Sequence, residues 1–145
     1  MAQETVDFGI KKCGLPKIKC VTKNLRIHGY QPTTDYSNCR YVYGSDLEKI
    51  VALQNQKSEY AEKLHSVFDI TVAEIIWAVR EEMAMTVEDV LARRVRALYF
   101  NAQKSMEIAP KVAQIMAKEL NKDEAWITEQ VKEYNLLAKN YFISY

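Results

Sequence analysis

The sequence predicts an all-α domain, a multi-helix arrangement of orthogonal or bundle-like form that follows an irregular N-terminal segment. Three observations predict it. Apolar residues recur at helical spacing through most of residues 45–145, three capping-box patterns mark helix starts there, and the stretch before them holds Gly29, Pro32 and Gly44. With 145 residues, 48% hydrophobic and 27% charged, the chain has the balance of one domain with its own core.

The first 13 residues read as a helix, because Ala2, Val6 and Ile10 recur every four residues. Gly14 suits a C-terminal stop. No Ser, Thr, Asp or Asn precedes the pattern as an N-cap, so we expect a helix that is entered partway along its length.

Residues 17–44 form the irregular part and hold four of the nine tyrosines, Tyr30, Tyr36, Tyr41 and Tyr43. A run this long without regular structure usually packs against another part of the protein or a partner. We interpret the tyrosines as amphipathic contacts between layers or domains. The alternative, stacking on single-stranded nucleic acid, is disfavoured because a net charge of +1 gives little attraction to a polyanion.

From Ser45 onward the expected helices carry their own start signals. The hydroxyl-and-acid pairs Ser45/Glu48, Thr71/Glu74 and Thr86/Asp89 have capping-box spacing and predict helices from near 46, 72 and 87. A fourth helix is expected from around Pro110 to Asn121, and a last one from about Asp123 to Tyr141. The helix over 72–84 has little polar face, so we place it centrally in the bundle.

The densest polar group surrounds that helix, and we interpret it as a structural ion-pair network joining consecutive helices, because acids nearly match bases locally. Asp89 and Arg93 can pair at i,i+4. Arg80 is expected to find a partner in Glu74, Glu81 or Asp89. The alternative is an anion site made by the last three arginines of the set. The candidates are Glu74, Arg80, Glu81, Asp89, Arg93, Arg94 and Arg96.

No catalytic, cofactor-binding or metal-ligating residue is predicted. Cys13, Cys20 and Cys39 lack the spacing of a zinc site, and we expect reduced, partly buried thiols. The four glycines form no phosphate-gripping turn between a strand and a helix, so the chain alone should not bind FAD. No apolar run is long enough to cross a membrane and no secretory signal opens the chain, so the default expectation is cytoplasmic.

The run TVAEIIWAVREEMAMTVEDVLARRVRALYFNA, Thr71 to Ala102, resembles the C-terminal domain of aerobic, FAD-dependent glycerol-3-phosphate dehydrogenases. That family typically shows A-E-x-x-x-A-x-R-x-E-M-A, then T-x-E-D-x-L-A-R-R-T-R, then a helix similar to APKVAQIMAKEL. IHGY and YGSD upstream also resemble family landmarks, and MAQETVDFGI resembles the last helix of the FAD domain. The chain departs from the pattern at Val95, where Thr is expected, at Asn101, where Asp is usual, and at Asn121, where Gly is common.

The resemblance implies a division into residues 1–44, the end of the FAD-domain helix plus a connecting segment, and residues 45–145, the helical domain. It implies a non-catalytic cap on an enzyme that oxidises sn-glycerol 3-phosphate to dihydroxyacetone phosphate and passes electrons through FAD to quinone. The implied partner is the FAD and substrate domain of the same polypeptide. Homo-oligomer formation and peripheral contact with the inner face of the cell membrane are further expectations. The alternative function is a free-standing helical protein-interaction module.

Overall fold

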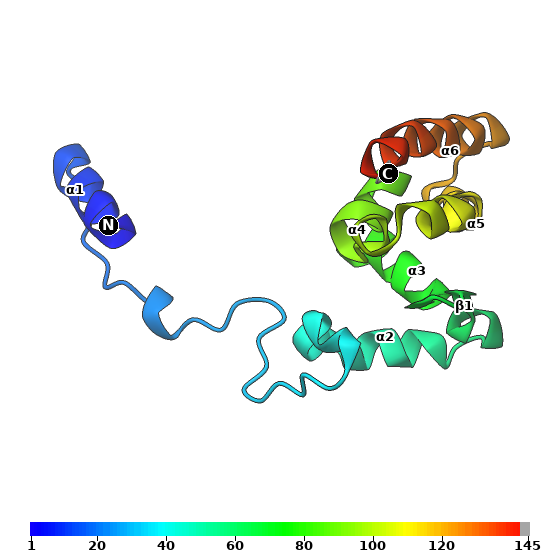
Figure 1. Ribbon diagram of the computed structural model, residues 1–145. Coiled ribbons are helices and arrows are strands. Elements are labelled where there is room, and N and C mark those ends of the chain that lie inside the picture. Colours follow the sequence, from blue (N-terminus) through cyan, green and yellow to red (C-terminus); the bar gives the residue numbers. More distant parts are fainter. Residues whose placement is uncertain (143–145) are drawn as a thin grey trace.

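The computed structural model describes residues 1–142; residues 143–145, at the end of the expected helical domain, lie outside the described part. Helices dominate, and the mostly helical class predicted from the sequence is confirmed (Figure 1). The α-helices are α1 (Ala2–Cys13), α2 (Leu47–Gln54), α3 (Val72–Glu81), α4 (Ala97–Phe100), α5 (Ala102–Leu120) and α6 (Glu124–Ala138). Short 3₁₀ segments are η1 (Thr22–Asn24), η2 (Cys39–Asp46), η3 (Ser58–Ala61) and η5 (Lys139–Tyr141), and η4 (Asp89–Arg94) is a π-helical turn.

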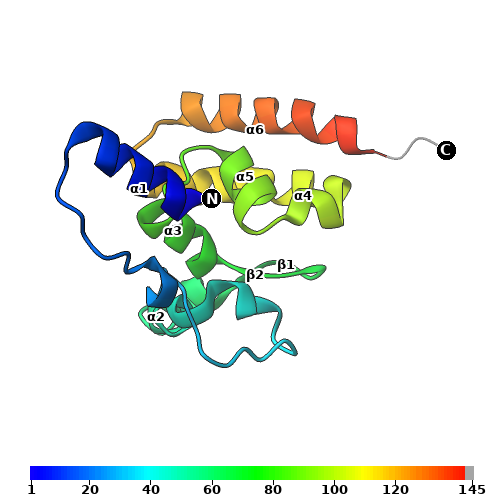
Figure 2. The same ribbon diagram turned by 90° about the vertical axis from the view of Figure 1, so that its left-hand side faces the viewer.

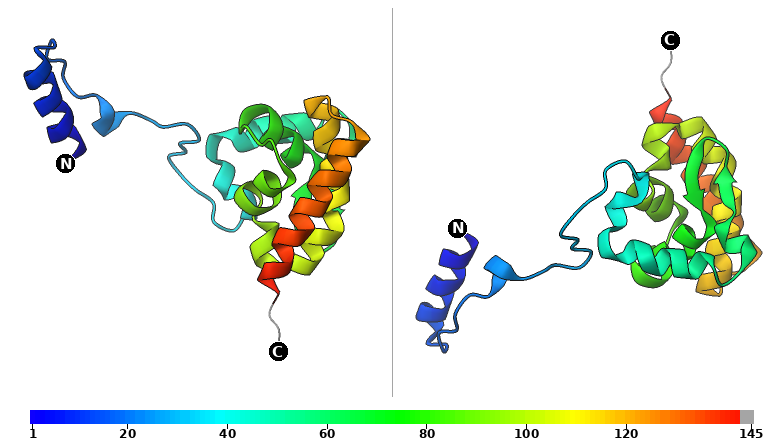
Figure 3. Two further views of the ribbon diagram at one scale, coloured as in Figure 1. Left: turned by 90° about the horizontal axis from the view of Figure 1, so that it is seen from above. Right: turned by 90° about the horizontal axis from the view of Figure 1, so that it is seen from below.

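Helix α1 stands away from the rest of the molecule (Figures 1 and 3). It ends as predicted at Gly14, whose φ of 64° is left-handed, but none of its residues is buried. Val6 and Phe8 are 60% and 67% exposed. The apolar stripe that makes this segment a helix therefore has no partner within the described residues.

Two of the three expected capping boxes form. At the start of α3, Glu74 accepts a hydrogen bond from the backbone N–H of Thr71 at 2.9 Å. Before η4, Asp89 N–H donates to the Thr86 hydroxyl at 3.1 Å and Thr86 N–H donates back to the Asp89 carboxylate at 3.0 Å. The capping box predicted at Ser45 is wrong. Because η2 runs directly into α2, the Leu47 N–H already bonds to the Gly44 carbonyl and α2 starts without a side-chain cap.

The expected helix start at Pro110 is also wrong, because Pro110 lies inside the 19-residue helix α5. The helix begins after Asn101, whose side chain accepts from Lys104 N–H at 3.0 Å. Asn101 thus supplies the cap that an Asp would supply. Proline removes one backbone donor, and burial of the neighbouring Ile108, Ala109 and Val112 offsets that loss.

A feature that the sequence analysis missed is a β-hairpin between α2 and α3. Strand β1 (Lys63–His65) pairs antiparallel with β2 (Phe68–Thr71), with an irregular register (Figure 2). The turn holds no glycine or asparagine; instead His65 Nδ1 accepts from the Val67 N–H at 3.0 Å. Strands this short, without a turn signature, give almost no periodic signal.

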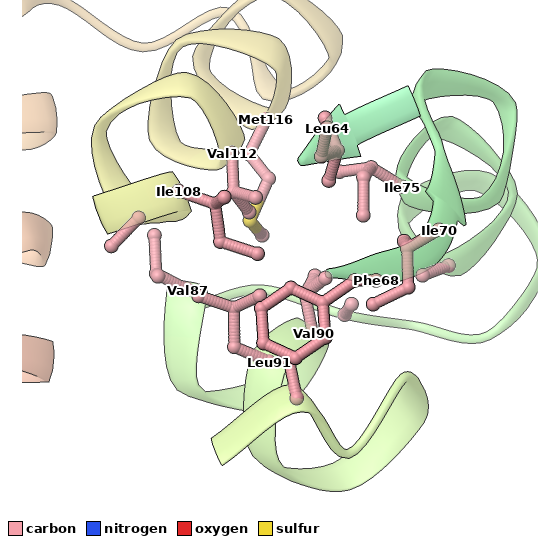
Figure 4. Packing of buried hydrophobic residues seen from close by; sticks show 14 of the residues in the cluster. Leu64, Phe68, Ile70, Ile75, Val87, Val90, Leu91, Ile108, Val112 and Met116 are labelled. Atoms are coloured by element: carbon pink, nitrogen blue, oxygen red, sulfur yellow. The ribbon is translucent and has the colours of Figure 1, made fainter. Parts of the chain in front are cut away.

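The core lies where the hairpin, α3, the η4 segment and α5 converge, and their apolar side chains meet in Figure 4. Residues of α3 from Val72 to Ala78 are all buried, which confirms the central place expected for this helix. Helix α6 packs along α5, and its Tyr134 is buried at 2% exposure. Its hydroxyl donates to Ser105 Oγ at 2.8 Å, so the one buried phenol of this interface is satisfied.

Residues 28–30 of the irregular N-terminal segment lie against η2 through a close backbone contact. Gly29 and Gly44 approach so closely that a Cβ on Gly44 would lie 1.8 Å from the Gly29 carbonyl oxygen. Beside this contact, His28 Nε2 lies 2.6 Å from the buried Asp46 carboxylate. We call the contact of residues 28–30 with residues 43–46 the glycine clasp. It joins the two stretches, IHGY and YGSD, that the family resemblance singled out.

Candidate functional site

A cavity of about 630 Å³ opens between η2, the hairpin and the η4–α4 segment. Its lining comes from stretches far apart in the sequence: Cys39–Tyr43, Val67–Ile70, Glu74, Arg93–Arg96, Phe100 and Asn101. Four guanidinium groups and two carboxylates share the lining with apolar and aromatic side chains. We call this cavity the arginine pocket. It gathers cationic donors and an apolar wall in one concave site, the composition of a binding site for an organic anion.

Arg40 is the most enclosed cation of the arginine pocket, with its side chain 19% exposed. One Nη lies 3.4 Å from Glu74 and 3.9 Å from Asp69, at the long end of ion-pair distances. Its Nε is buried and has no hydrogen-bond partner among the described residues. A buried guanidinium donor without an acceptor is rare in native proteins and asks for an explanation.

Glu74 links the capping box to this pocket. Its carboxylate accepts from Thr71, as described, and also from the Tyr43 hydroxyl at 3.2 Å. Burial of Tyr43 and the nearby Glu74 charge raise the pKa of the phenol, so Tyr43 remains a neutral donor. The carboxylate is therefore held by several donors and is only a distant partner for Arg40.

Arg93 and Arg94 are placed by the π-helical turn, in which Val95 N–H bonds back five residues to the Val90 carbonyl. Arg93 pairs with Asp89 and Glu88, each at 2.6 Å. Arg94 donates to the Glu82 carbonyl at 2.6 Å and lies 3.4 Å from the Glu82 carboxylate. Single π turns inside helices occur frequently at functional sites.

Arg96 differs from its neighbours, because no carboxylate in residues 1–142 lies within ion-pair distance of its guanidinium. Its backbone has φ 57°, an uncommon left-handed value for a residue other than glycine. The preceding residue, Val95, also lines the pocket, so the departure from Thr makes the lining more apolar. Arg96 is therefore an exposed cation of the site that has no ion-pair partner among the described residues.

Two other members of the predicted ion-pair set lie elsewhere. Arg80 forms no ion pair with Glu74, Glu81 or Asp89; it makes a bidentate pair with Glu119 of α5, at 2.6 and 3.0 Å. Glu81 has no ion-pair partner among the described residues. The structure thus brings Glu74, Arg93, Arg94 and Arg96 to one cavity, whereas the structural role assigned to the whole set stays a prediction.

Sequence reasoning missed Arg40 and Tyr43 as members of this site. They lie in the irregular segment, more than 50 residues from Arg94, and only the fold brings them together. The thiols also differ from expectation: Cys13, Cys20 and Cys39 are free but exposed. Cys39 Sγ donates to Asp69 at 3.4 Å, and its pKa is raised, chiefly by partial burial.

The residues present do not fit FAD. A dinucleotide is usually held by a glycine-rich turn between a parallel strand and a helix. The only sheet in residues 1–142 is the two-stranded antiparallel hairpin, and Gly9, Gly14, Gly29 and Gly44 lie outside it. No group of three or more His, Cys, Asp or Glu side chains in the described part is placed to bind a metal ion.

These features define a class: a mostly helical domain with an arginine-lined pocket and, in residues 1–142, without a nucleotide cradle. Comparison with known families identifies which family this domain belongs to. The family model for the C-terminal domain of alpha-glycerophosphate oxidase matches residues 20–127. The chain therefore belongs to this family, and the family suggested by the sequence motifs is confirmed.

Several relatives are glycerol-3-phosphate dehydrogenases. A probable mitochondrial one of Caenorhabditis elegans is 31% identical over 83% of this chain and 19% of its own length. One of Dictyostelium discoideum is 27% identical, with 97% and 24% covered, and the human mitochondrial enzyme is 26% identical, with 91% and 21% covered. The chain thus spans about a fifth to a quarter of these relatives. No solved structure matches it.

The expectation of a cytoplasmic protein, at the inner face of a cell membrane in the intact enzyme, is wrong. The relatives are named as mitochondrial glycerol-3-phosphate dehydrogenases. The expectation rested on the opening residues of a chain that spans a small part of those proteins, and such residues say nothing about targeting. Among the helices of residues 1–142, none has both the length and the apolar character needed to cross a membrane.

Proposed function

We propose that this chain serves as the non-catalytic C-terminal helical domain of a mitochondrial glycerol-3-phosphate dehydrogenase. The intact enzyme would oxidise sn-glycerol 3-phosphate to dihydroxyacetone phosphate, and its FAD would pass the electrons to quinone. The observation that carries the proposal is the family match over residues 20–127, together with relatives of that name that cover most of the chain.

The role proposed for the domain is support of a flavin-bearing part in the same polypeptide. Helix α1 supports this role, because its apolar residues Val6 and Phe8 are exposed and pack on nothing in residues 1–142. A helix of this kind is stable when its apolar stripe is covered. We assign residues 1–44 to the connection with that part and residues 45–145 to the helical domain.

Three expectations belong to the intact enzyme: bound FAD, peripheral contact with a membrane where quinone is reduced, and assembly into a homo-oligomer. The lack of a flavin cradle in the described residues agrees with FAD binding elsewhere in the polypeptide. No nucleic acid is expected as a partner, since a net charge of +1 gives little long-range attraction to a polyanion.

A chimera tests the proposal. In the Caenorhabditis elegans relative, the region matched by this chain is replaced with residues 1–145. We expect the chimera to bind FAD and to oxidise glycerol 3-phosphate with an artificial electron acceptor, whereas the same relative with the region deleted should not fold into active enzyme. The isolated chain, given FAD and substrate, should show no turnover. Robust turnover by the isolated chain would refute the non-catalytic role.

A further inference from the structure

The arginine pocket places arginine side chains opposite a wall of apolar side chains. Arg40, Arg93, Arg94 and Arg96 line it, against the two acids Asp69 and Glu74. Asp69 is already engaged by Lys63 at 2.8 Å, a contact that helps to lower the pKa of its carboxyl group. Arg93 is paired with Glu88 and Asp89, and Arg94 with Glu82, so Arg40 and Arg96 are the guanidinium groups of the site without a close carboxylate among the described residues.

Two of these cations are placed to bind something absent from the chain. Arg40 has only the long contacts of one Nη with Glu74 and Asp69, at 3.4 and 3.9 Å. Arg96 has no acidic partner in the described residues, it lines the pocket, and its backbone is left-handed. Guanidinium groups bind anions that carry two or more oxygens, so such an anion is the kind of ligand that these two arginines suit.

The size and lining of the pocket indicate what accompanies the anionic group. A volume of about 630 Å³ is that of small-molecule sites and far exceeds one carboxylate side chain. Phe68 and Ile70 form a buried apolar wall, and Val67 and Phe100, 56% and 78% exposed, extend it toward the opening. Val95 adds a further apolar contact.

We propose that the arginine pocket binds an amphipathic organic anion, a phosphate or carboxylate head on an apolar body, with Arg40 and Arg96 as the head-group ligands. The proposed site is made only of residues of this chain. An acidic side chain from the flavin-bearing part is the competing occupant, which the pocket volume disfavours.

Titration calorimetry with the isolated chain tests the proposal, with n-hexyl phosphate as the probe. We expect one binding site. Inorganic phosphate and glycerol 3-phosphate, which carry the head without an apolar body, should bind at least about tenfold more weakly, because burial of only two methylene groups gives that factor. Equal binding of the three would show a plain anion site and overturn the proposal.

Arg96→Asn is the informative variant, because Arg96 is exposed and asparagine tolerates a left-handed backbone. It should weaken hexyl phosphate binding about tenfold or more, as expected for loss of a charge-assisted hydrogen bond. Arg40→Gln should do the same. Arg26→Asn, an exposed arginine outside the pocket, is the matched control and should leave the affinity unchanged. No binding by the wild-type chain, or wild-type affinity in the Arg96→Asn and Arg40→Gln variants, would overturn the proposal.

A vesicle sedimentation experiment distinguishes a lipid headgroup from a soluble anion as the ligand. If the ligand is a lipid headgroup, the chain should sediment with phosphatidylcholine vesicles that contain phosphatidic acid, and Arg96→Asn should abolish the effect. If hexyl phosphate binds and such vesicles do not, the ligand is a soluble amphipathic anion. Both outcomes support the site, and they separate its two sources.

Discussion

At Gly44 the backbone has φ 52° and ψ −128°, and its Cα faces the Gly29 carbonyl. No side chain fits there, since a Cβ would lie 1.8 Å from that oxygen. We expect Gly44→Ala to open the glycine clasp and destabilise the protein by about 2 kcal/mol or more. Thermal unfolding measures the loss of stability, and the rate of limited proteolysis at sites before residue 39 measures the opening of the glycine clasp. Gly9→Ala, in open space on α1, is the control and should be neutral or slightly stabilising.

Asp89 makes stability depend on pH. Burial alone would raise the pKa of its carboxyl group, but hydrogen bonds from Thr86, Met85 and Arg93 outweigh burial and lower it. Because the pKa of Asp89 is lower in the folded state, its ionised carboxylate stabilises the protein at pH values above the unfolded-state pKa of about 3.9. This stabilisation is lost as the pH falls through the folded-state pKa.

We therefore expect Asp89→Asn to cost about 1–2 kcal/mol at pH 7 and progressively less below about pH 4. Urea unfolding of both proteins at several pH values measures the difference. A difference in unfolding free energy that stays constant down to the acid limit would contradict the account.

At the residue scale, the sequence predicted what is local. The Thr71/Glu74 and Thr86/Asp89 boxes and the Gly14 stop form as expected, because each depends on a few neighbouring residues. The partner of Arg80 was not predictable, since Glu119 is 39 positions away and on another helix. Arg40 was missed for the same reason.

Among the elements, the contact between α5 and α6 buries a polar pair within apolar packing. Tyr134 donates to Ser105, and Ser105 in turn donates to the Ala102 carbonyl at 2.7 Å. Burial raises the pKa of Tyr134 to about 12, which keeps the phenol protonated.

We expect Tyr134→Phe to cost only about 1 kcal/mol, because the Ser105 hydroxyl keeps its bond to Ala102. Tyr134→Ala should cost about 3–5 kcal/mol through the cavity that it leaves. Chemical denaturation of the two variants measures the contrast. Equal costs would mean that the hydroxyl, and not the packing of the ring, stabilises this interface.

The errors at the element scale have physical causes. Pro110 suggested a helix start, yet a helix capped by Asn101 and packed through Ile108 and Val112 tolerates an internal proline. The hairpin at 63–71 gave no turn signature, because a histidine side chain stabilises its turn. In α5, tertiary packing outweighs the local preference of proline.

For the whole molecule, the division of the chain has a direct consequence for stability. Residues 11–28 are all exposed, and α1 buries nothing, so a chain that starts at residue 27 should melt at the same temperature as the full chain. A chain that starts at residue 45 loses the glycine clasp, Arg40 and Tyr43, and should melt about 5 °C lower or more. Circular dichroism measures both. A marked loss on removing residues 1–26 alone would contradict the account.

The central claim is that these residues support a redox reaction whose cofactor is held elsewhere in the polypeptide. Its most direct test is the visible absorption spectrum of the purified chain after incubation with FAD and gel filtration. We predict that no flavin elutes with the protein, because the described part offers no turn to grip a dinucleotide. Stoichiometric flavin that remains with the protein peak would contradict the claim.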